Sequence, residues 1–380
     1  MRILRSLLFL AAFSLLDVVT SGDLTTADGE FPYGDYPAFE RDPEIGVRPK
    51  TPPPRTKGMN VLYFVIDDLR NEVGFSNDRK GISTPNIDTL ATSPGSLIFD
   101  RMYVQQGVCS PSRNSFLSGR RPDTTRVWNF KQSELYFYFK YSLLIFLFLL
   151  CEGFRDTLGY NVTALPEAFK NAGYLSAGLG KVYHPGQPKG DDCPKRYGKF
   201  KSSCPSWSSD FAYFHGSESG CSGYNDTKSG YGTWQACSAP DGAFLDGTIK
   251  NHALMRLKQL AARAPQRFFL AVGFHKPHVP WHMPLEFLDK QTPVDDIDIA
   301  LHGERDSSQC GNTSFYRCAI VSSNGELKVS PDKPIVKAAA QQYRRAYRAA
   351  MSYMDYVVGE MLNELEELGL KNNTIVVFHG

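Results

Sequence analysis

One short stretch of this 380-residue chain places a nucleophile close to a cation. Cys109 and Arg113 stand four residues apart in the run Cys-Ser-Pro-Ser-Arg, and Arg120 and Arg121 follow. A thiol beside a positive charge can be a reactive cysteine, because the charge favours the thiolate. A cysteine can equally be a buried structural residue, which is the commoner case. Residue types alone therefore leave two interpretations of Cys109 open, a nucleophile or a core residue.

A second candidate for chemistry is a pair of adjacent carboxylates. Asp67 and Asp68 directly follow the apolar run of residues 61–66. Neighbouring carboxylates repel each other unless a cation neutralises them, and hard cations prefer oxygen ligands. In open α/β sheets, ligand sites lie beyond the carboxyl ends of the strands, which is where this pair would stand. The pair therefore predicts a metal site, and a turn with two solvated acids is the alternative.

The elements that would position these residues are visible as alternating apolar runs and helical patterns. Continuous apolar runs are typical of parallel strands buried on both faces, and they span residues 61–66, 174–179, 268–274 and 374–378. Helical periodicity spans residues 166–171, 249–261 and 343–368. This alternation predicts an α/β fold with a mostly parallel central sheet and helices on both of its faces.

The N-terminus has the layout of a cleaved signal peptide. Two arginines precede an apolar run over residues 7–16, and small residues follow at 21–22. We expect a signal peptide over residues 1–22 and a propeptide or loose arm over 23–58. Four glycosylation sequons agree with passage through the secretory pathway, to the lysosome or the cell exterior: they begin at Asn161, Asn225, Asn312 and Asn372.

In a secreted chain, cysteines without a chemical role favour disulfides, because the compartment is oxidising. Setting aside Cys109 and Cys151 leaves six: Cys193, Cys204, Cys221, Cys237, Cys310 and Cys318. A zinc site is the alternative, but the sequence contains no Cys-X-X-Cys pair. Sequence alone allows many pairings, and the short spacings favour bridges 193–204, 221–237 and 310–318.

Two further features bear on partners. The net charge of +2 is too small to predict binding to nucleic acid, so a polyanionic substrate would have to be met by locally placed cations. Residues 136–151 are almost wholly apolar and aromatic, and no neighbouring segment of the sequence is predicted to pack against them. We expect residues 131–153 to be a doubtful insertion, such as translated intron. Their uncharged part is too short to cross a bilayer, so we expect no stable membrane insertion.

The segment around Cys109 resembles the signature of the type I sulfatases. That signature is Cys-X-Pro-X-Arg followed by Ser-Gly-Arg, and its cysteine is oxidised to formylglycine in the endoplasmic reticulum. The resemblance extends over most of residues 59–380, which would form the N-terminal catalytic domain. Segments 60–68 and 84–88 are similar to the family's first strand, with its metal-binding acids, and to the segment after it. The chain resembles the iduronate-2-sulfatase branch in particular at residues 105–106, 119–126, 180–185 and 273–280.

The resemblance implies the site, residue by residue. Catalytic roles fall on Cys109, Arg113, Lys181, His184 and His278. Ligand roles toward one Ca²⁺ ion fall on Asp67, Asp68, Cys109 and His379. The nucleophile would be formylglycine, made from Cys109 by the formylglycine-generating enzyme. His275 belongs to the same motif as His278 and could serve the site or simply hold the turn.

The implied reaction removes the 2-sulfate from terminal iduronate of heparan or dermatan sulfate. One hydroxyl of the hydrated aldehyde attacks sulfur, and the second later expels sulfate by re-forming the aldehyde. The alternatives are a sulfatase for another glycan and a catalytically inactive, sulfatase-like binding protein. A phosphatase or phosphodiesterase of the same superfamily would carry Ser or Thr in place of Cys109.

The sequence departs from the family pattern after its last strand. The family has Ser/Thr-Asp-His-Gly there, whereas this chain reads Phe378-His379-Gly380. His379 matches the family's histidine, but the aspartate before it has no counterpart. Because Ca²⁺ prefers about six to eight oxygen ligands, we expect the chain as written to be inactive, truncated before its C-terminal subdomain.

Overall fold

The computed structural model describes the chain in several stretches, all within one compact unit, Pro54–Gly380. The described residues are 58–76, 82–128, 155, 162–184, 204–230, 232–299 and 335–380. Several sequence predictions lie outside them: the signal peptide over 1–22, nearly all of the arm over 23–58, the insertion over 131–153, and Cys193, Cys310 and Cys318.

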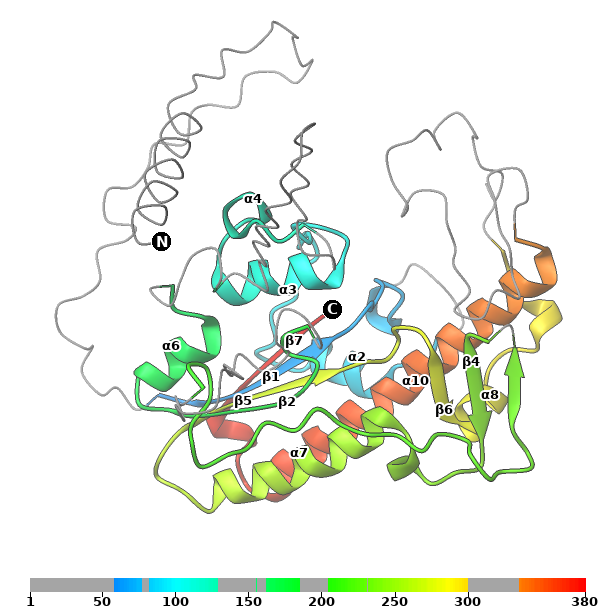
Figure 1. Cartoon of the computed structure of the whole chain (residues 1–380). Helices are drawn as coiled ribbons and strands as arrows, with labels where there is room; N and C mark the ends of the chain where they lie inside the picture. The colour runs from blue at the N-terminus through cyan, green and yellow to red at the C-terminus, as the bar shows by residue number, and fades with distance from the viewer. Residues whose placement is uncertain are drawn as a thin grey trace, which may run out of the picture. The chain divides into compact units, whose positions relative to one another are not determined.

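Four parallel strands form the central sheet, in the order β2-β5-β1-β7 (Figure 1). They are β1 (Asn60–Ile66), β2 (Leu175–Gly180), β5 (Phe268–Phe274) and β7 (Thr374–His379). Every residue of β1, β2 and β5 is buried, as expected of a sheet covered on both faces. In the register, Ile66 pairs with Phe274 and Gly180 pairs with Gly273, so β1, β2 and β5 end at one edge. The predicted parallel sheet is confirmed, with strand limits within one residue.

Helices cover both faces of this sheet (Figure 1). The α-helices are α2 (Pro85–Thr92), α3 (Cys109–Ser118), α4 (Pro122–Thr125), α6 (Leu165–Asn171), α7 (Leu245–Ala261), α8 (Leu285–Asp289) and α10 (Lys337–Glu367). Single 3₁₀ turns are η1 (Gly74–Ser76), η2 (Asp241–Ala243), η3 (Val294–Asp296) and η5 (Lys371–Asn373). Because side chains alternate across a strand, β1 divides between two cores. Leu62 and Phe64 pack with α7 and α10, whereas Val61 and Tyr63 pack with α3 and α6.

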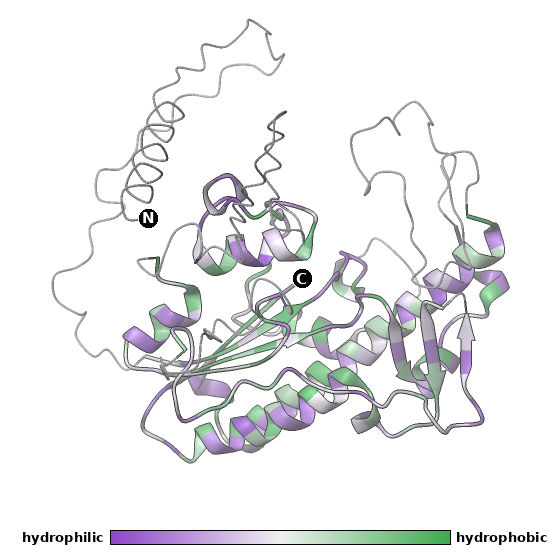
Figure 2. Cartoon of the chain, in the orientation of Figure 1, coloured by the Kyte–Doolittle hydropathy of each residue, from purple (hydrophilic) through white to green (hydrophobic). Residues whose placement is uncertain are grey.

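The long helix α10 shows why the sequence folds this way locally. Its apolar side chains recur at helical spacing and are fully buried: Met354, Val357, Val358 and Met361. The helix is followed by Gly369, whose φ of +67° suits a residue without a Cβ. Figure 2 shows the contrast with the central strands, which are mostly hydrophobic, whereas hydrophilic and hydrophobic residues alternate along α7 and α10.

A second, smaller sheet has the order β3-β4-β6. Its strands are β3 (Lys228–Gly230), β4 (Trp234–Cys237) and β6 (Trp281–Pro284). A disulfide between Cys221 and Cys237, with Cα atoms 5.8 Å apart, ties β4 to the preceding loop. This bond confirms the predicted 221–237 pairing.

Among the residues that the structure describes, no helix has the length and apolarity needed to cross a bilayer. Two of the predicted sequon asparagines fall within the described residues, and both Asn225 and Asn372 are exposed.

Candidate active site

The carboxyl edge of the central sheet collects residues from three distant parts of the chain. Asp67 directly follows β1, Lys181 directly follows β2, and the turn His275–His278 follows β5. The Asp67 amide donates to the carbonyl of Phe274 over 3.2 Å, and the Lys181 amide donates to the carbonyl of Gly273 over 2.8 Å. The parallel register therefore continues into the loops and fixes the backbone of each residue.

Two glycines allow the chain after β2 to lie directly against β5. Gly180 has φ of +69°, and a Cβ built on it would lie 2.0 Å from the carbonyl oxygen of Gly273. A Cβ built on Gly273 would lie 2.1 Å from the backbone of Lys181. No side chain fits at either position, because both obstacles are backbone atoms. The close approach of these two backbones fixes the position of the Lys181 backbone.

A buried ionic cluster connects Asp67 to two cations. Arg113 Nη2 lies 2.8 Å from Asp67 Oδ1, and Lys181 Nζ donates to Asp67 Oδ2. All three residues are only 3% exposed. Burial would raise the pKa of the Asp67 carboxyl, but Arg113 and Lys181 outweigh it and hold that pKa well below its ordinary value. Asp67 is therefore an anion at any physiological pH.

Arg113 also ties helix α3 to the loop after β2. Its Nη1 donates to the carbonyl oxygens of Lys181 and Val182, the second over 3.0 Å. Its Nε is buried and has no hydrogen-bond partner among the described residues. A buried donor without an acceptor is costly, so this atom marks a place where an anionic ligand would be stabilised.

Cys109 is the first residue of α3, one turn before Arg113. Its thiol is free and half-buried. Burial raises the pKa of this thiol, and the nearby charges oppose one another: Lys181 and Arg113 lower it, whereas Asp67 and Asp68 raise it. Catalytic thiolates have lowered pKa values instead. The environment therefore does not prepare Cys109 to act as a thiolate.

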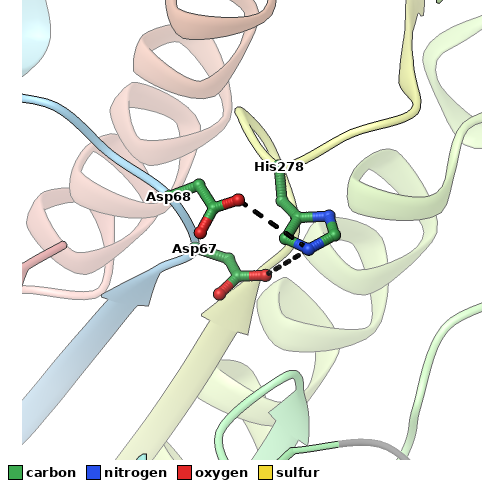
Figure 3. A group of neighbouring side chains, drawn as sticks. All are labelled: Asp67, Asp68 and His278. Carbon is green, nitrogen blue, oxygen red and sulfur yellow. Dashed lines mark ion pairs between the residues drawn. The ribbon is translucent and has the colours of Figure 1, made fainter. Parts of the chain in front are cut away.

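Three side chains form a candidate metal group, which Figure 3 shows: Asp67, Asp68 and His278. The ligand atoms all lie within 4.8 Å of one another. His278 Nε2 is 3.9 Å from Asp67 Oδ2 and 3.8 Å from Asp68 Oδ2, too far for hydrogen bonds. Such separations suit ligands that share one cation at about 2.3–2.6 Å from each.

The hydrogen-bond contact of His278 suits a ligand role. Its Nδ1 contacts the carbonyl oxygen of Val279, which can only accept a hydrogen bond. The neutral ring therefore carries its proton on Nδ1 and presents the lone pair of Nε2 to the two carboxylates. Two carboxylates with an imidazole fit a divalent cation, and carboxylates in particular suit Ca²⁺, Mg²⁺ or Mn²⁺. Sequence analysis gave His278 a catalytic role and no ligand role, and the structure brings it to the predicted metal ligands Asp67 and Asp68.

The other predicted histidines have different surroundings. Burial, and then Lys181 and Arg113, lower the pKa of His184 to about 4, so its ring is neutral near neutral pH. His379 ends β7 and lies outside the Asp67–Asp68–His278 group. Its Nδ1 donates to the Gly380 carbonyl, so its Nε2 accepts the Tyr63 hydroxyl over 2.6 Å. The metal roles predicted for His379 and Cys109 therefore stay predictions.

One supporting residue was missed by sequence reasoning. Tyr347, in α10, donates its hydroxyl to the backbone carbonyl of Asp68 over 2.8 Å and accepts the amide of Arg70 over 2.9 Å. This bridge holds the loop that carries the acid pair. Sequence periodicity identified Tyr347 only as part of the helical stripe, and no local pattern reveals its hydroxyl contacts.

The chain belongs to the sulfatase family, whose family model, described as "Sulfatase", matches residues 59–380. It is 33% identical to iduronate 2-sulfatase of Homo sapiens and 32% identical to that of Mus musculus. Each match covers 85% of this chain and 54% of the relative. The chain thus spans about half the length of these relatives. The family resemblance seen in the sequence is confirmed.

Solved structures agree on the fold. The chain is similar to the phosphonate monoester hydrolase of Silicibacter pomeroyi, with a TM-score of 0.58 at 16% identity, over 84% of this chain and 61% of that one. It is also similar to the putative sulfatase yidJ of Bacteroides fragilis, with a TM-score of 0.53 at 18% identity, over 87% and 63%. At these identities the similarity defines the alkaline-phosphatase-like α/β fold and nothing finer.

Proposed function

We propose that this protein is a sulfuric ester hydrolase whose nucleophile is a formylglycine made from Cys109. The observation that carries the proposal is the position of Cys109 at the start of α3, beside two buried cations and an acid pair. The sulfatase signature alone would mark Cys109, and the fold adds the charges that such chemistry needs.

The cations are suited to hold a sulfate group. Arg113 and Lys181 bring two buried positive charges to the site. The first residues of α3 lie at the positive end of the helix dipole, which favours an anion. In a site shielded from water these fixed charges stabilise developing negative charge far better than solvated ones.

The aldehyde hydrate of formylglycine, once formed, would supply a nucleophilic hydroxyl and a route for releasing sulfate that neither Cys nor Ser offers. Asp67 and Asp68, with His278, would hold one divalent cation, for which we propose Ca²⁺, and it would supply positive charge beside the nucleophile. Because its pKa is lowered to about 4, His184 is neutral near neutral pH, so it would offer the bound sulfate a hydrogen bond rather than a positive charge or an acidic proton.

We propose the 2-sulfate of terminal iduronate in heparan or dermatan sulfate as the substrate. Support comes from the identity with iduronate 2-sulfatases, which extends over 85% of this chain. We further propose passage through the secretory pathway to the lysosome or cell exterior, with the formylglycine-generating enzyme as a partner on the way. The Cys221–Cys237 disulfide and the exposed sequon residues Asn225 and Asn372 support an oxidising route.

Mass spectrometry of the Cys109 peptide tests the proposed function. The chain secreted from cells that contain the formylglycine-generating enzyme should carry an aldehyde at this position, and Cys109→Ser should carry none. A thiol that stays unmodified throughout would contradict the proposal. The test does not depend on turnover, because it detects the modification of a single residue.

Turnover is a separate question, measured with a 4-methylumbelliferyl iduronide 2-sulfate against a generic aryl sulfate. The structure gathers three ligand side chains in its described part, fewer than Ca²⁺ prefers. We therefore expect weak Ca²⁺ binding and no turnover by these 380 residues alone. Measurable hydrolysis of the iduronide would instead show that the ligands present are sufficient, and would support the proposed substrate directly.

A further inference from the structure

A helix carboxylate holds the turn that carries His278. Asp246 stands in the first turn of α7 and is fully buried. Its Oδ1 accepts the backbone amide of His275 over 2.7 Å, and its Oδ2 accepts the backbone amide of Lys276 over 2.7 Å. Both oxygens are thus occupied by successive amides of one turn, a geometry that only a carboxylate can satisfy.

The rest of the turn passes this constraint on to His278. The amide of His278 donates to the carbonyl of His275 over 2.8 Å, which closes the turn. The indole of Trp281 donates to the carbonyl of Pro277. The ring of His278 is then fixed through Nδ1, and its Nε2 faces Asp67 and Asp68 (Figure 3). A chain of short contacts therefore runs from α7 to the candidate metal group.

The placement of Asp246 is energetically demanding. A fully buried carboxylate loses its hydration and needs partners to offset that loss. Burial raises the pKa of Asp246, while Lys276 and the amides of His275 and Lys276 oppose the rise. An apolar residue here would avoid the cost but leave two buried amides without acceptors. The partners of Asp246 thus lie in the turn that supplies His278.

Helix α10 offers a matched carboxylate away from this turn. Asp355 is also buried, and it accepts the backbone amides of Asn86 over 3.2 Å and Ile87 over 2.8 Å. Its partners lie in the first turn of α2. Asp246 and Asp355 therefore accept hydrogen bonds from successive amides in the same way. They differ in the segment that those amides belong to, which is the turn with His278 for Asp246 and α2 for Asp355.

We propose that Asp246 is a positioning residue that holds the His275–His278 turn and thereby sets the His278 imidazole against the Asp67–Asp68 pair. Its value to the enzyme rests on the proposed metal site. The geometry itself can be measured without a metal, so the two ideas can fail separately.

The first test is NMR of the full chain labelled with ¹⁵N-histidine, in metal-free buffer, with His278→Ala identifying the His278 signals. In the wild type, at a pH high enough to keep the ring neutral, His278 should show one tautomer, protonated on Nδ1. Asp246→Asn replaces one acceptor oxygen with an amide group, so the His278 signals should move toward tautomer averaging. Asp355→Asn should leave them unchanged. Wild-type signals in Asp246→Asn, or equal changes in both variants, would overturn the proposal.

The second test is calorimetric titration of the same proteins with CaCl₂. Asp246→Asn should weaken Ca²⁺ binding by roughly 10- to 100-fold, the usual effect of losing a residue that supports a metal ligand. Asp355→Asn should bind as the wild type does. In a His278→Ala background, Asp246→Asn should cause no further loss, because its effect passes through His278. An undiminished loss in that background would overturn the proposal. If the wild type binds no Ca²⁺, the proposed metal site fails, and the NMR result alone decides the role of Asp246.

Asp246→Glu covers the case in which Asp246→Asn fails to fold. It keeps the charge and both acceptor oxygens but moves them by one methylene. A residue that merely supplies buried charge would tolerate the change. Displaced His278 signals in Asp246→Glu are the expected result, and wild-type signals would contradict a positioning role.

Discussion

The α10-covered face of the central sheet and the carboxyl edge of the same sheet are buried to a similar degree but are stabilised by different forces. On the face covered by α10, Met354 and Val357 are fully buried and contact other apolar side chains. At the carboxyl edge, Asp67, Arg113 and Lys181 are nearly as buried, but each depends on a particular charged partner. Apolar packing is non-directional and accepts substitutes of similar volume. Buried charge tolerates no such exchange, because removing one partner leaves the other without compensation.

The largest effect on stability is expected from breaking the buried charge cluster. Arg113→Ala leaves Asp67 with fewer cations and frees the carbonyls of Lys181 and Val182, so it should lower the free energy of unfolding by about 3–5 kcal/mol. Urea denaturation would measure this. Arg113→Lys keeps the charge but loses the planar guanidinium, so it should recover only part of the loss. A loss below about 1 kcal/mol in Arg113→Ala would remove the contrast between the α10 face and the carboxyl edge.

A smaller loss with a different signature is expected on the apolar face. Met354→Ala should cost about 2–5 kcal/mol, because it removes buried methylene groups and leaves a cavity. Met354→Leu, which nearly conserves volume, should cost less than about 1.5 kcal/mol. Neither variant should change the His278 tautomer seen by ¹⁵N NMR. A changed tautomer in Met354→Leu would show that the apolar face also positions the site.

The smallest effect is expected at a partly exposed pair outside both regions. Glu218 lies 3.3 Å from His282 Nδ1, and its hydrogen bond to His282 lowers the pKa of its carboxyl. Glu218→Gln should cost less than about 1 kcal/mol near pH 7. Because the folded pKa lies below the unfolded one, the stabilisation is present above the unfolded pKa and is lost as the pH falls through the lowered value. Denaturation curves of the two proteins should therefore converge in acid, and a difference that grows in acid would contradict this sign.

Sequence periodicity predicted the parts of the fold that depend on local pattern. The central strands are continuous apolar runs, and the stripe of α10 repeats at helical spacing. The predicted start of that helix, at 343, was six residues late, because Lys337–Gln342 carry no apolar stripe and are helical through their alanines. The short strands β4 and β6 were not predicted. Four residues give too little pattern, and their pairing joins segments more than forty residues apart.

At the site, the signature and its neighbouring motifs identified Asp67, Arg113 and Lys181, which the structure brings together. Residues that act through backbone contacts could not be predicted from the sequence. Asp246 and Tyr347 bond to amides and carbonyls far away in the sequence, and their own surroundings read as ordinary helix. Sequence motifs show which groups can do chemistry, whereas the residues that hold them depend on tertiary contacts that no local pattern records.

The close approach of Gly180 and Gly273 affects how genetic variation in this protein should be interpreted. Neither position carries a functional group, yet any side chain there would meet backbone atoms about 2 Å away and displace Lys181. In a library that samples every substitution, both positions should therefore tolerate as few substitutions as Cys109 does. A missense change at either glycine would resemble an active-site lesion, because it would displace the buried charge of Lys181. Only the abundance of folded protein would distinguish it from the loss of a reacting group.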